Sequence, residues 1–437
     1  MSLYQHHLQT LLERYRQACD QFALGAIALH SGSLTYYTND DNAHPFHPMP
    51  LTQQWLPFDL MPEAWLIISK DSAPTLIWPD RPDFWHVTPK LTEGDWQQHW
   101  KIVKASQTSI SALLPKPVAV LSHQPDGIDF IEPQNVNPVE LLNWLNFDRA
   151  VKTEWEIEQL SIASQRAVRG HRAAKEAFLS GLCEYDIHLA YLRASKQQQL
   201  EEPYGSIVAL NEGAAVLHYE NKHLEAPKCS NTLLIDAGAK INGYASDITR
   251  TFTQGNDFFL DLVKAVDALQ LRLCQQCTVG TNYLDIHNSA LQEIAALLHQ
   301  SGLCKLGVEE QLAKKVTQTF FPHGIGHLLG LNVHDAGGLQ QNRQGDLATR
   351  PEHAPFLRLM RPLQNNTVVT IEPGLYFIPM LLEKMIAEIP EHGCDLKLIE
   401  TLKPFGGIRI EDNVVAKAEG TLNLTRTSFE EINFSDS

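Results

Sequence analysis

Three carboxylates stand inside segments that otherwise read as buried β-strands. Asp236 follows Thr-Leu-Leu-Ile, Glu372 follows Thr-Val-Val-Thr-Ile, and Glu411 follows Gly-Gly-Ile-Arg-Ile. Strands that carry Val, Ile and Leu on both faces are typical of a covered sheet. A carboxylate in such a strand is destabilising unless a positive charge compensates it. Because no run of lysines accompanies these strands, we expect metal ions to supply the positive charge.

A β-hairpin is expected to bring a fourth carboxylate close to Asp236. Asn242-Gly243 is a strong signal for a type I′ turn between the strand that ends at Asp236 and a returning strand. With this turn, position 236 faces position 249, and Asp247 is a diagonal neighbour of Asp236 on the same face. Two carboxylates this close need a shared proton or a cation. The alternative is one turn-capping and one exposed aspartate, and a bulge would change the register.

Three histidines fall within twelve positions, in a segment that is rich in glycine. His323 and His327 have the i, i+4 spacing of a helix, but Gly324 and Gly326 argue against a regular helix, and the glutamate of an H-E-x-x-H motif is missing. Glycines at these positions would let the backbone and an imidazole approach a crowded centre. His334 is the third of the group. Each alone would more often be a structural residue, but together they favour a site.

Arg409 lies two residues before Glu411 on the same expected strand, so both side chains leave the same face. An arginine there could bind the carboxylate of a substrate through two hydrogen bonds. The equally supported alternative is a salt bridge that neutralises Glu411 or Asp412.

Four carboxylates and one or more imidazoles form an oxygen-rich set of ligands. Such a set favours two hard or borderline divalent ions over a thiolate zinc site. Two ions roughly 3.5–4 Å apart can activate a water molecule and stabilise the transition state of a hydrolysis.

Composition argues against several other classes of protein. The formal net charge of −16 disfavours a nucleic-acid or anionic-membrane surface. We expect no transmembrane helix and no signal peptide. The seven scattered cysteines fit a reducing cytoplasm better than a disulfide framework. Cys274 and Cys277 form a C-x-x-C pair, which we expect to be two helix-surface or core thiols, with a redox or zinc role as the alternative.

The chain of 437 residues is long enough for two or three domains. Residues 1–150 alternate apolar strands with helices and predict a small α/β domain. Thr153 and Glu156 form a capping box that opens a helix to about Leu179, and residues 151–437 predict an α+β domain with helices over its sheet. The strands expected in the first domain are 26–29, 64–68, 75–78 and 118–121.

The five candidate ligands, in this order, resemble the ligand set of the pita-bread metallopeptidases, which include methionine aminopeptidase, aminopeptidase P, prolidase and creatinase. The set is Asp236, Asp247, His327, Glu372 and Glu411. The surrounding words are most similar to the bacterial prolidase branch: Asp-Ala-Gly-Ala, Asp-Ile-Thr-Arg-Thr, Pro-His-Gly-Ile-Gly-His, Ile-Glu-Pro-Gly-Leu-Tyr-Phe-Ile and Gly-Gly-Ile-Arg-Ile-Glu-Asp-Asn. The long segment before the last of these words resembles the prolidases related to organophosphorus acid anhydrolases.

The resemblance implies a pita-bread catalytic domain, a homodimer and two divalent ions per subunit, usually manganese. Asp247 and Glu411 would bridge the two ions, Asp236 would complete one of them, and His327 and Glu372 would complete the other. A hydroxide between the ions would attack the carbonyl carbon of an Xaa-Pro bond. Glu372 would move protons between that water and the leaving prolyl nitrogen.

Further site residues also follow from the resemblance. His218, His323 and His334 would stabilise the oxyanion or orient the substrate. Arg409 would hold the carboxyl terminus of a dipeptide.

The remaining predicted residues concern the recognition of the substrate. Tyr204, Leu217 and Val333 would shape the side-chain pockets. Asp41 of the partner subunit's amino-terminal domain would help to close the site, with Asp40 as the alternative if the alignment slips by one.

The expected activity is that of an Xaa-Pro dipeptidase, with phosphotriester hydrolysis as a hypothetical side activity. Two alternatives stay open at this point. One is an aminopeptidase P that accepts longer Xaa-Pro peptides, and the other is a metal-free pita-bread binding module.

Overall fold

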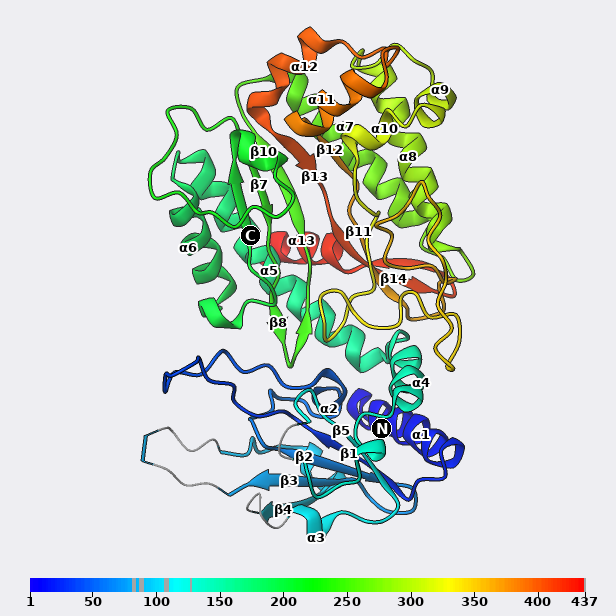
Figure 1. Cartoon of the computed structure of the whole chain (residues 1–437). Helices are drawn as coiled ribbons and strands as arrows, with labels where there is room; N and C mark the ends of the chain where they lie inside the picture. The colour runs from blue at the N-terminus through cyan, green and yellow to red at the C-terminus, as the bar shows by residue number, and fades with distance from the viewer. Residues whose placement is uncertain (81–83, 86–89, 106–109, 126–127, 436–437) are drawn as a thin grey trace. The chain divides into compact units, whose positions relative to one another are not determined.

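The computed structural model describes residues 1–80, 84–85, 90–105, 110–125 and 128–435 (Figure 1). The chain divides into two compact units, one made of residues 1–156 and 340–346 and the other of the remainder. In the part of the chain that is described, no helix combines the length and apolar character needed to cross a membrane.

The first unit contains one five-stranded sheet and its covering helices. The sheet has the strand order β4-β3-β2-β1-β5, with β1 antiparallel to β2 and parallel to β5. All four strands expected from the sequence are present. The elements of this unit are α1 Leu3–Gln21, β1 Ala26–His30, α2 Pro50–Gln53, β2 Trp65–Ser69, β3 Thr75–Pro79, η1 Asp95–His99, β4 Lys101–Ala105, α3 Ile110–Leu113, β5 Val118–Leu121, η3 Pro133–Asn135 and α4 Val139–Arg149.

Strand alternation explains why this sheet is covered on both faces. Ile27 and Leu29 of β1 join the apolar cluster that contains Leu11 of α1. Ala28 of the same strand joins the opposite cluster, which contains Ile110 of α3. Because successive side chains of a strand point to opposite faces, one apolar strand contributes to two cores. The predicted small α/β domain is confirmed.

The first unit also includes a segment from far along the chain. Residues 340–346 fall within the predicted second domain, yet they pack on α4. Arg343 donates to Asp148 at 2.8 Å and lies over the ring of Trp144, with its guanidinium carbon 4.6 Å from the centroid. Gln340 donates to the Asn143 carbonyl at 3.2 Å. These contacts join residues almost 200 positions apart. The predicted division of the chain at a single boundary near residue 150 could not place residues 340–346 in the first unit.

The second unit holds two three-stranded sheets and two short pairs of strands. The sheets have the orders β10-β7-β6 and β11-β14-β15, and the pairs are β12-β13 and β8-β9. Its elements are α5 Glu154–Leu179, which begins at the end of the first unit, α6 Glu184–Ser195, η4 Gln199–Glu201, β6 Ile207–Leu210, η5 Asn211–Ala215, β7 Thr232–Asp236, β8 Lys240–Ile241, β9 Tyr244–Ala245, β10 Thr249–Thr253, α7 Asp257–Gln275, α8 Tyr283–Gln300, α9 Val308–Ala313, α10 Thr317–Phe320, β11 Val368–Ile371, β12 Gly374–Tyr376, α11 Pro379–Glu388, α12 Leu396–Leu402, η6 Lys403–Phe405, β13 Gly407–Arg409, β14 Asp412–Lys417, β15 Gly420–Asn423 and α13 Leu424–Ser435.

Helices cover these strands, as the predicted α+β arrangement requires. In Figure 1, α6 and α8 lie on opposite sides of the strands. Phe178 of α5 and Tyr191 of α6 pack with Val208 and Ile235 of the β6-β7 pair. Single bridges join the sheets to their neighbours, among them Thr249 with Glu411. The strand ends that carry the candidate ligands are therefore brought side by side.

The capping box that opens α5 is confirmed. The Thr153 hydroxyl accepts from the Glu156 amide at 3.3 Å, and the Glu156 carboxylate accepts from the Thr153 amide at 2.7 Å. Two amides that the helix itself leaves unpaired are satisfied in this way.

The predicted hairpin is also confirmed, with its register. Asn242 and Gly243 have φ values of 49° and 85°, as a type I′ turn requires. Asp236 pairs with Thr249 as predicted. An added Cβ at Gly238 would overlap the backbone oxygen of Ser246, so the chain passes here where only glycine fits.

The two cysteines of the C-x-x-C pair are core thiols. The Cys274 sulfur accepts from Gln270 at 3.1 Å, and the Cys277 thiol donates to the Leu273 carbonyl at 3.7 Å. Both side chains are buried. Burial and these local contacts therefore account for the pair, as the interpretation as core thiols predicted.

Candidate metal centre

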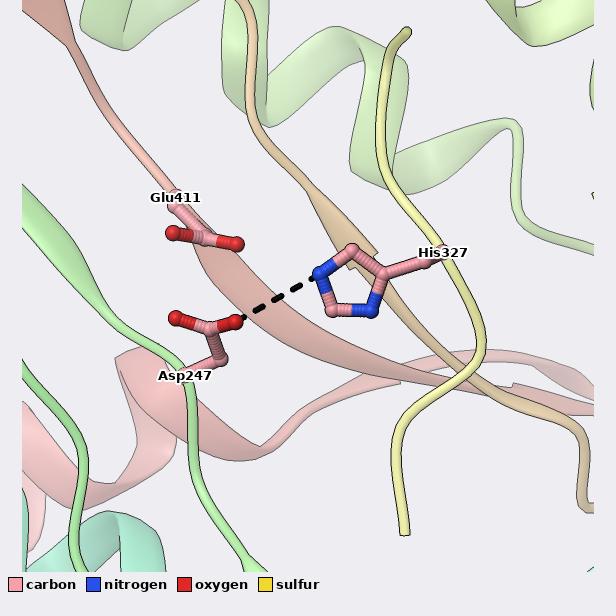
Figure 2. Close-up of side chains that lie close together, drawn as sticks. All are labelled: Asp247, His327 and Glu411. Atoms are coloured by element: carbon pink, nitrogen blue, oxygen red, sulfur yellow. Dashed lines mark ion pairs between the residues drawn. The ribbon is translucent and has the colours of Figure 1, made fainter. Parts of the chain in front are cut away.

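Asp247, His327 and Glu411 form the centre of the site (Figure 2). Each offers one ligand atom, and these atoms all lie within 4.8 Å of one another. The His327 Nε2 atom is 3.4 Å from Asp247 Oδ2. All three side chains are buried. Residues 164 positions apart in the sequence thus meet at one point of the fold.

Backbone pairing explains how these side chains come together. Asp247 precedes β10, and the Glu411 amide donates to the Thr249 carbonyl of that strand at 3.0 Å. His327 is held against β11, because the Thr370 amide donates to the His327 carbonyl at 3.0 Å and the Thr370 hydroxyl accepts from the His327 amide at 3.2 Å.

Asp236 and Glu372 lie at the two sides of this centre. The Tyr204 hydroxyl is 2.8 Å from Asp236 Oδ1 and 2.6 Å from Asp247 Oδ1. Glu372 Oε1 is 3.8 Å from His327 Nε2. A hydroxyl has one proton, so it can donate to only one of the two aspartates at a time. The structure therefore brings all five predicted ligands together and crowds their oxygens.

The electrostatics of the site fit cations. Burial raises the pKa of Glu411 well above its ordinary value and that of Glu372 to about 7, and it also raises the pKa of Asp236. Burial acts in the same direction on Asp247, but the hydrogen bond with His327, the charge of His327 and the hydrogen bond from Tyr204 together outweigh burial and lower the pKa of Asp247. Buried carboxylates that repel one another are stabilised by divalent ions. The donor set of four carboxylates and one imidazole suits hard or borderline ions.

Arg409 pairs directly with Asp236, not with Glu411 or Asp412. Its Nη2 atom donates to Asp236 Oδ2 at 2.8 Å, its Nη1 atom to the Tyr376 hydroxyl at 3.0 Å, and its Nε atom to the Thr249 hydroxyl at 3.3 Å. The alternative of a salt bridge to Asp412 is wrong, because strand β13 places Arg409 beside the sheet that carries Asp236.

Asp412 has other partners, which no sequence pattern indicated. Arg250 donates to Asp412 Oδ1 and Arg426 to Oδ2, each at 2.7 Å. Burial would raise the pKa of Asp412, but these two charges hold it well below its usual range. Arg250 also donates to the Glu411 carbonyl at 2.8 Å and so holds the ligand strand.

Asn413 and Thr249 were also missed as supporting residues. The Asn413 side chain accepts from the Asp247 amide at 3.1 Å and donates to the Asp247 carbonyl. The Thr249 hydroxyl donates to Glu411 Oε2 at 2.8 Å. Each stands two positions after a predicted ligand, so the sequence motifs that contain the ligands also contained these residues.

The three other predicted histidines have different settings. His323 donates from Nδ1 to the Gly324 carbonyl at 2.8 Å and accepts at Nε2 from the Tyr376 hydroxyl at 2.9 Å. The ring centroid of His334 is 4.3 Å from that of His327. The side chains of His218 and His334 are exposed. Both ring nitrogens of His323 are thus engaged within the protein, whereas His218 and His334 are accessible.

Of the residues predicted to contact the substrate, Tyr204 lies at the centre, and the others are described by their exposure. Tyr204 contacts two candidate ligands, a role that differs from the predicted shaping of a pocket. Leu217 and Val333 are half-buried, next to His218 and His334 in the chain. Asp41 and Asp40 are exposed residues of the first unit.

Fold and site together define a metal-dependent hydrolase. Residues 158–418 match the family model described as metallopeptidase family M24, and residues 2–147 match that of the Xaa-Pro dipeptidase amino-terminal domain. The chain belongs to metallopeptidase family M24. The predicted family, the pita-bread catalytic fold and the hydrolase class are confirmed.

Relatives agree with this membership, and solved structures share the fold. The chain is 40% identical to an Xaa-Pro dipeptidase of Pseudoalteromonas haloplanktis, over 97% of this chain and 98% of the relative. It is 41% identical to an Xaa-Pro dipeptidase of Xanthomonas axonopodis pv. citri, with 98% of each covered. Aminopeptidase P from E. coli has a similar fold, with a TM-score of 0.72 at 23% identity over 99% of this chain and 97% of that one. The aminopeptidase PepP of Pseudomonas aeruginosa has a TM-score of 0.73 at 24% identity over 97% of each chain.

Proposed function

We propose that this enzyme is an Xaa-Pro dipeptidase, which hydrolyses dipeptides that end in proline. The observation that carries the proposal is the convergence of five candidate ligand residues, three of them buried and two half-buried, in a chain that resembles Xaa-Pro dipeptidases over nearly its full length. The match of the amino-terminal domain supports the same substrate class.

We propose that the five residues hold two divalent ions and that the activating metal is manganese. The two oxygens of Asp247 support a bridging role, because Oδ1 faces Tyr204 and Asp236 while Oδ2 faces His327. Asp236 would complete the first site, and His327 with Glu372 the second. Glu411, at the centre, would bind both ions.

Divalent ions in this place would polarise the scissile carbonyl and make water nucleophilic near neutral pH. Glu372 is the candidate for proton transfer to the prolyl nitrogen. Its side chain is 19% exposed, against 8% for Asp247, so among these two carboxylates it is the one that substrate reaches more easily. His323 Nδ1 lies 3.9 Å from Glu372 Oε2.

The exposed imidazoles of His218 and His334 are proposed to stabilise the oxyanion or to orient the substrate. His323 has no ring N–H left for an oxyanion, since its Nδ1 proton goes to Gly324. We therefore propose that His323 positions Tyr376 and, through it, Arg409.

Arg409 is proposed both to hold residues of the metal centre and to bind the substrate. Three of its five N–H groups hold Asp236, Tyr376 and Thr249. The remaining N–H groups of its terminal nitrogens are the candidates for the carboxylate of the dipeptide. Leu217 and Val333 are proposed to line the side-chain pockets.

The recognition of both ends of a dipeptide is proposed to need a second subunit. We propose a homodimer in which Asp41, or Asp40, of the partner subunit's amino-terminal domain closes the site. Sedimentation would test the dimer, and the KM of an Asp41→Ala variant would test the residue. A cytoplasmic location and a weak phosphotriesterase activity remain further proposals.

A comparison of Xaa-Pro dipeptides with matched Xaa-Pro tripeptides tests the function. The purified enzyme with Mn²⁺ should have the higher kcat/KM for the dipeptides. Faster cleavage of tripeptides would favour aminopeptidase P instead. Absence of bound metal together with no activity after addition of Mn²⁺ would favour a binding module.

A further inference from the structure

Two cysteines outside the metal centre face each other across a single antiparallel bridge. Cys304 follows α8, and Cys394 lies between α11 and α12. The Lys305 amide donates to the Gly393 carbonyl at 2.9 Å, and the Asp395 amide donates to the Leu303 carbonyl at 3.0 Å. These flanking bonds make the cysteines a non-hydrogen-bonded pair, in which side chains approach most closely.

The backbone geometry of such a pair suits a disulfide. Cα atoms of a non-hydrogen-bonded pair lie about 4.5 Å apart. Disulfides span Cα separations of roughly 4.4–6.8 Å. A bond could therefore form without a shift of either backbone segment.

Both thiols also point into the same space. The Sγ atoms of Cys304 and Cys394 lie 3.4 Å and 3.5 Å from one acceptor, the His392 carbonyl oxygen. Met385 Sδ lies 3.8 Å from the Cys394 sulfur. Cys304 is buried and Cys394 is half-buried, so only Cys394 offers a path for a reagent. Burial, with the neighbouring Cys304 thiol, raises the pKa of Cys394.

We propose that Cys304 and Cys394 form a reversible redox site, which a small disulfide such as oxidised glutathione converts to an intramolecular disulfide. The Cys394 thiolate attacks one sulfur of the reagent and releases one glutathione. The Cys304 thiolate then attacks the Cys394 sulfur of the mixed disulfide, forms the S–S bond and releases the second glutathione. Two thiols lose two protons and two electrons, and the reagent is reduced to two thiols.

The disulfide would tie the connection between α8 and α9 to the connection between α11 and α12. In the chain, the latter segment lies between Glu372 and Arg409. Because the thiolate is the attacking species, the raised pKa makes the reaction slow at neutral pH and faster in alkaline buffer.

Peptide mapping by mass spectrometry tests the proposal. The full-length protein is treated with oxidised glutathione at pH 7 and pH 9, then alkylated and digested. We expect a linked peptide pair that contains Cys304 and Cys394, formed faster at pH 9 and released by dithiothreitol. The cross-link should raise the melting temperature by roughly 5 °C.

Three variants make the result specific. Cys394→Ser and Cys304→Ser should each abolish the linked peptide, and Cys229→Ser, which removes an exposed cysteine elsewhere, should retain it. Melting curves show whether the variants fold. If Cys304→Ser does not fold, Cys394→Ser is the decisive variant, because Cys394 is only half-buried. Glutathione that stays attached to Cys394, or oxidation of Cys229 alone at both pH values, would overturn the proposal.

Discussion

Asp247 is held in place by a residue that is not itself a ligand. Asn413 pairs with both the amide and the carbonyl of Asp247. Residues that orient metal ligands typically contribute 10–100-fold to metal affinity. Support of this kind fixes the orientation of the Asp247 carboxylate toward the candidate metal centre, which burial alone would not do.

We predict that Asn413→Ala weakens metal binding about 10–100-fold without removing a ligand. Activity should fall at limiting Mn²⁺ and recover largely at saturating Mn²⁺, because the five ligands remain. Titration of metal-free protein with Mn²⁺ measures the change. Asn365→Ala, at an exposed position, is the control and should leave the titration unchanged. Equal loss at all metal concentrations would contradict the proposed role.

His287 gives a prediction about stability and pH. Its side chain is 3% exposed, its Nδ1 atom has no hydrogen-bond partner among the described residues, and burial lowers its pKa to about 4. Between pH 6.5 and 4 the unfolded chain binds a proton that the folded chain does not. Unfolding therefore becomes easier as the pH falls through this range, by up to about 1.4 kcal/mol per pH unit from this one group.

We predict that His287→Gln makes the free energy of unfolding depend less steeply on pH, by up to that amount per pH unit. Urea unfolding of metal-free protein between pH 4 and 6.5 measures it, since the contribution of the metal-centre carboxylates cancels between wild type and variant. The exposed His6→Gln serves as the control. Parallel curves for wild type and His287→Gln would show that His287 titrates normally.

At the scale of elements, the hairpin was predictable because its determinants are local. The Asn242-Gly243 turn sets the register, and the register sets the face of Asp247. Strand β4 was missed because Lys-Ile-Val-Lys-Ala reads as a short, charged segment, which is typical of an edge strand. The partner of Arg409 was not predictable, since strand periodicity gives a face but not the neighbouring sheet.

We predict that Gly238→Ala damages both folding and activity. A Cβ there would overlap the Ser246 oxygen and lie 2.9 Å from a ring carbon of Tyr204. Overpacking of this kind costs about 1–3 kcal/mol, and displacement of Tyr204 would disturb Asp236 and Asp247. Thermal unfolding and kcat/KM measure the two effects.

Gly307→Ala is the matched control for that experiment. A Cβ at Gly307 meets no atom within 4 Å, and its φ of −68° suits any residue. Gly307 is the N-cap of α9, where glycine is preferred to alanine, so the variant should lower the free energy of unfolding by at most about 1 kcal/mol and leave kcat/KM unchanged. Similar behaviour of the two variants would mean that the close approach at Gly238 does not matter.

At the scale of the whole molecule, the family and the convergence of the candidate ligands were predictable from the sequence motifs that contain them. The placement of residues 340–346 in the first unit was not, because it depends on contacts between distant parts of the chain. The same holds for the pairing of Asp412 with Arg250 and Arg426. Long-range charge pairs leave no periodic trace in a sequence.

We predict that removal of metal destabilises the catalytic unit as a whole, since the crowded carboxylates then repel one another. Ions present at about a thousand times their Kd stabilise a protein by about 4 kcal/mol. Melting with EDTA and again with added Mn²⁺ measures the shift. Glu411→Gln should remove most of it, and an unchanged melting temperature in wild type would argue against a bound ion.

The most direct test of the central claim is anomalous X-ray scattering from crystals soaked in Mn²⁺. We predict two peaks per chain, both in contact with Asp247 and Glu411, one also with Asp236 and the other also with His327 and Glu372. A site without peaks, or with peaks that these five side chains do not bind, would contradict the account.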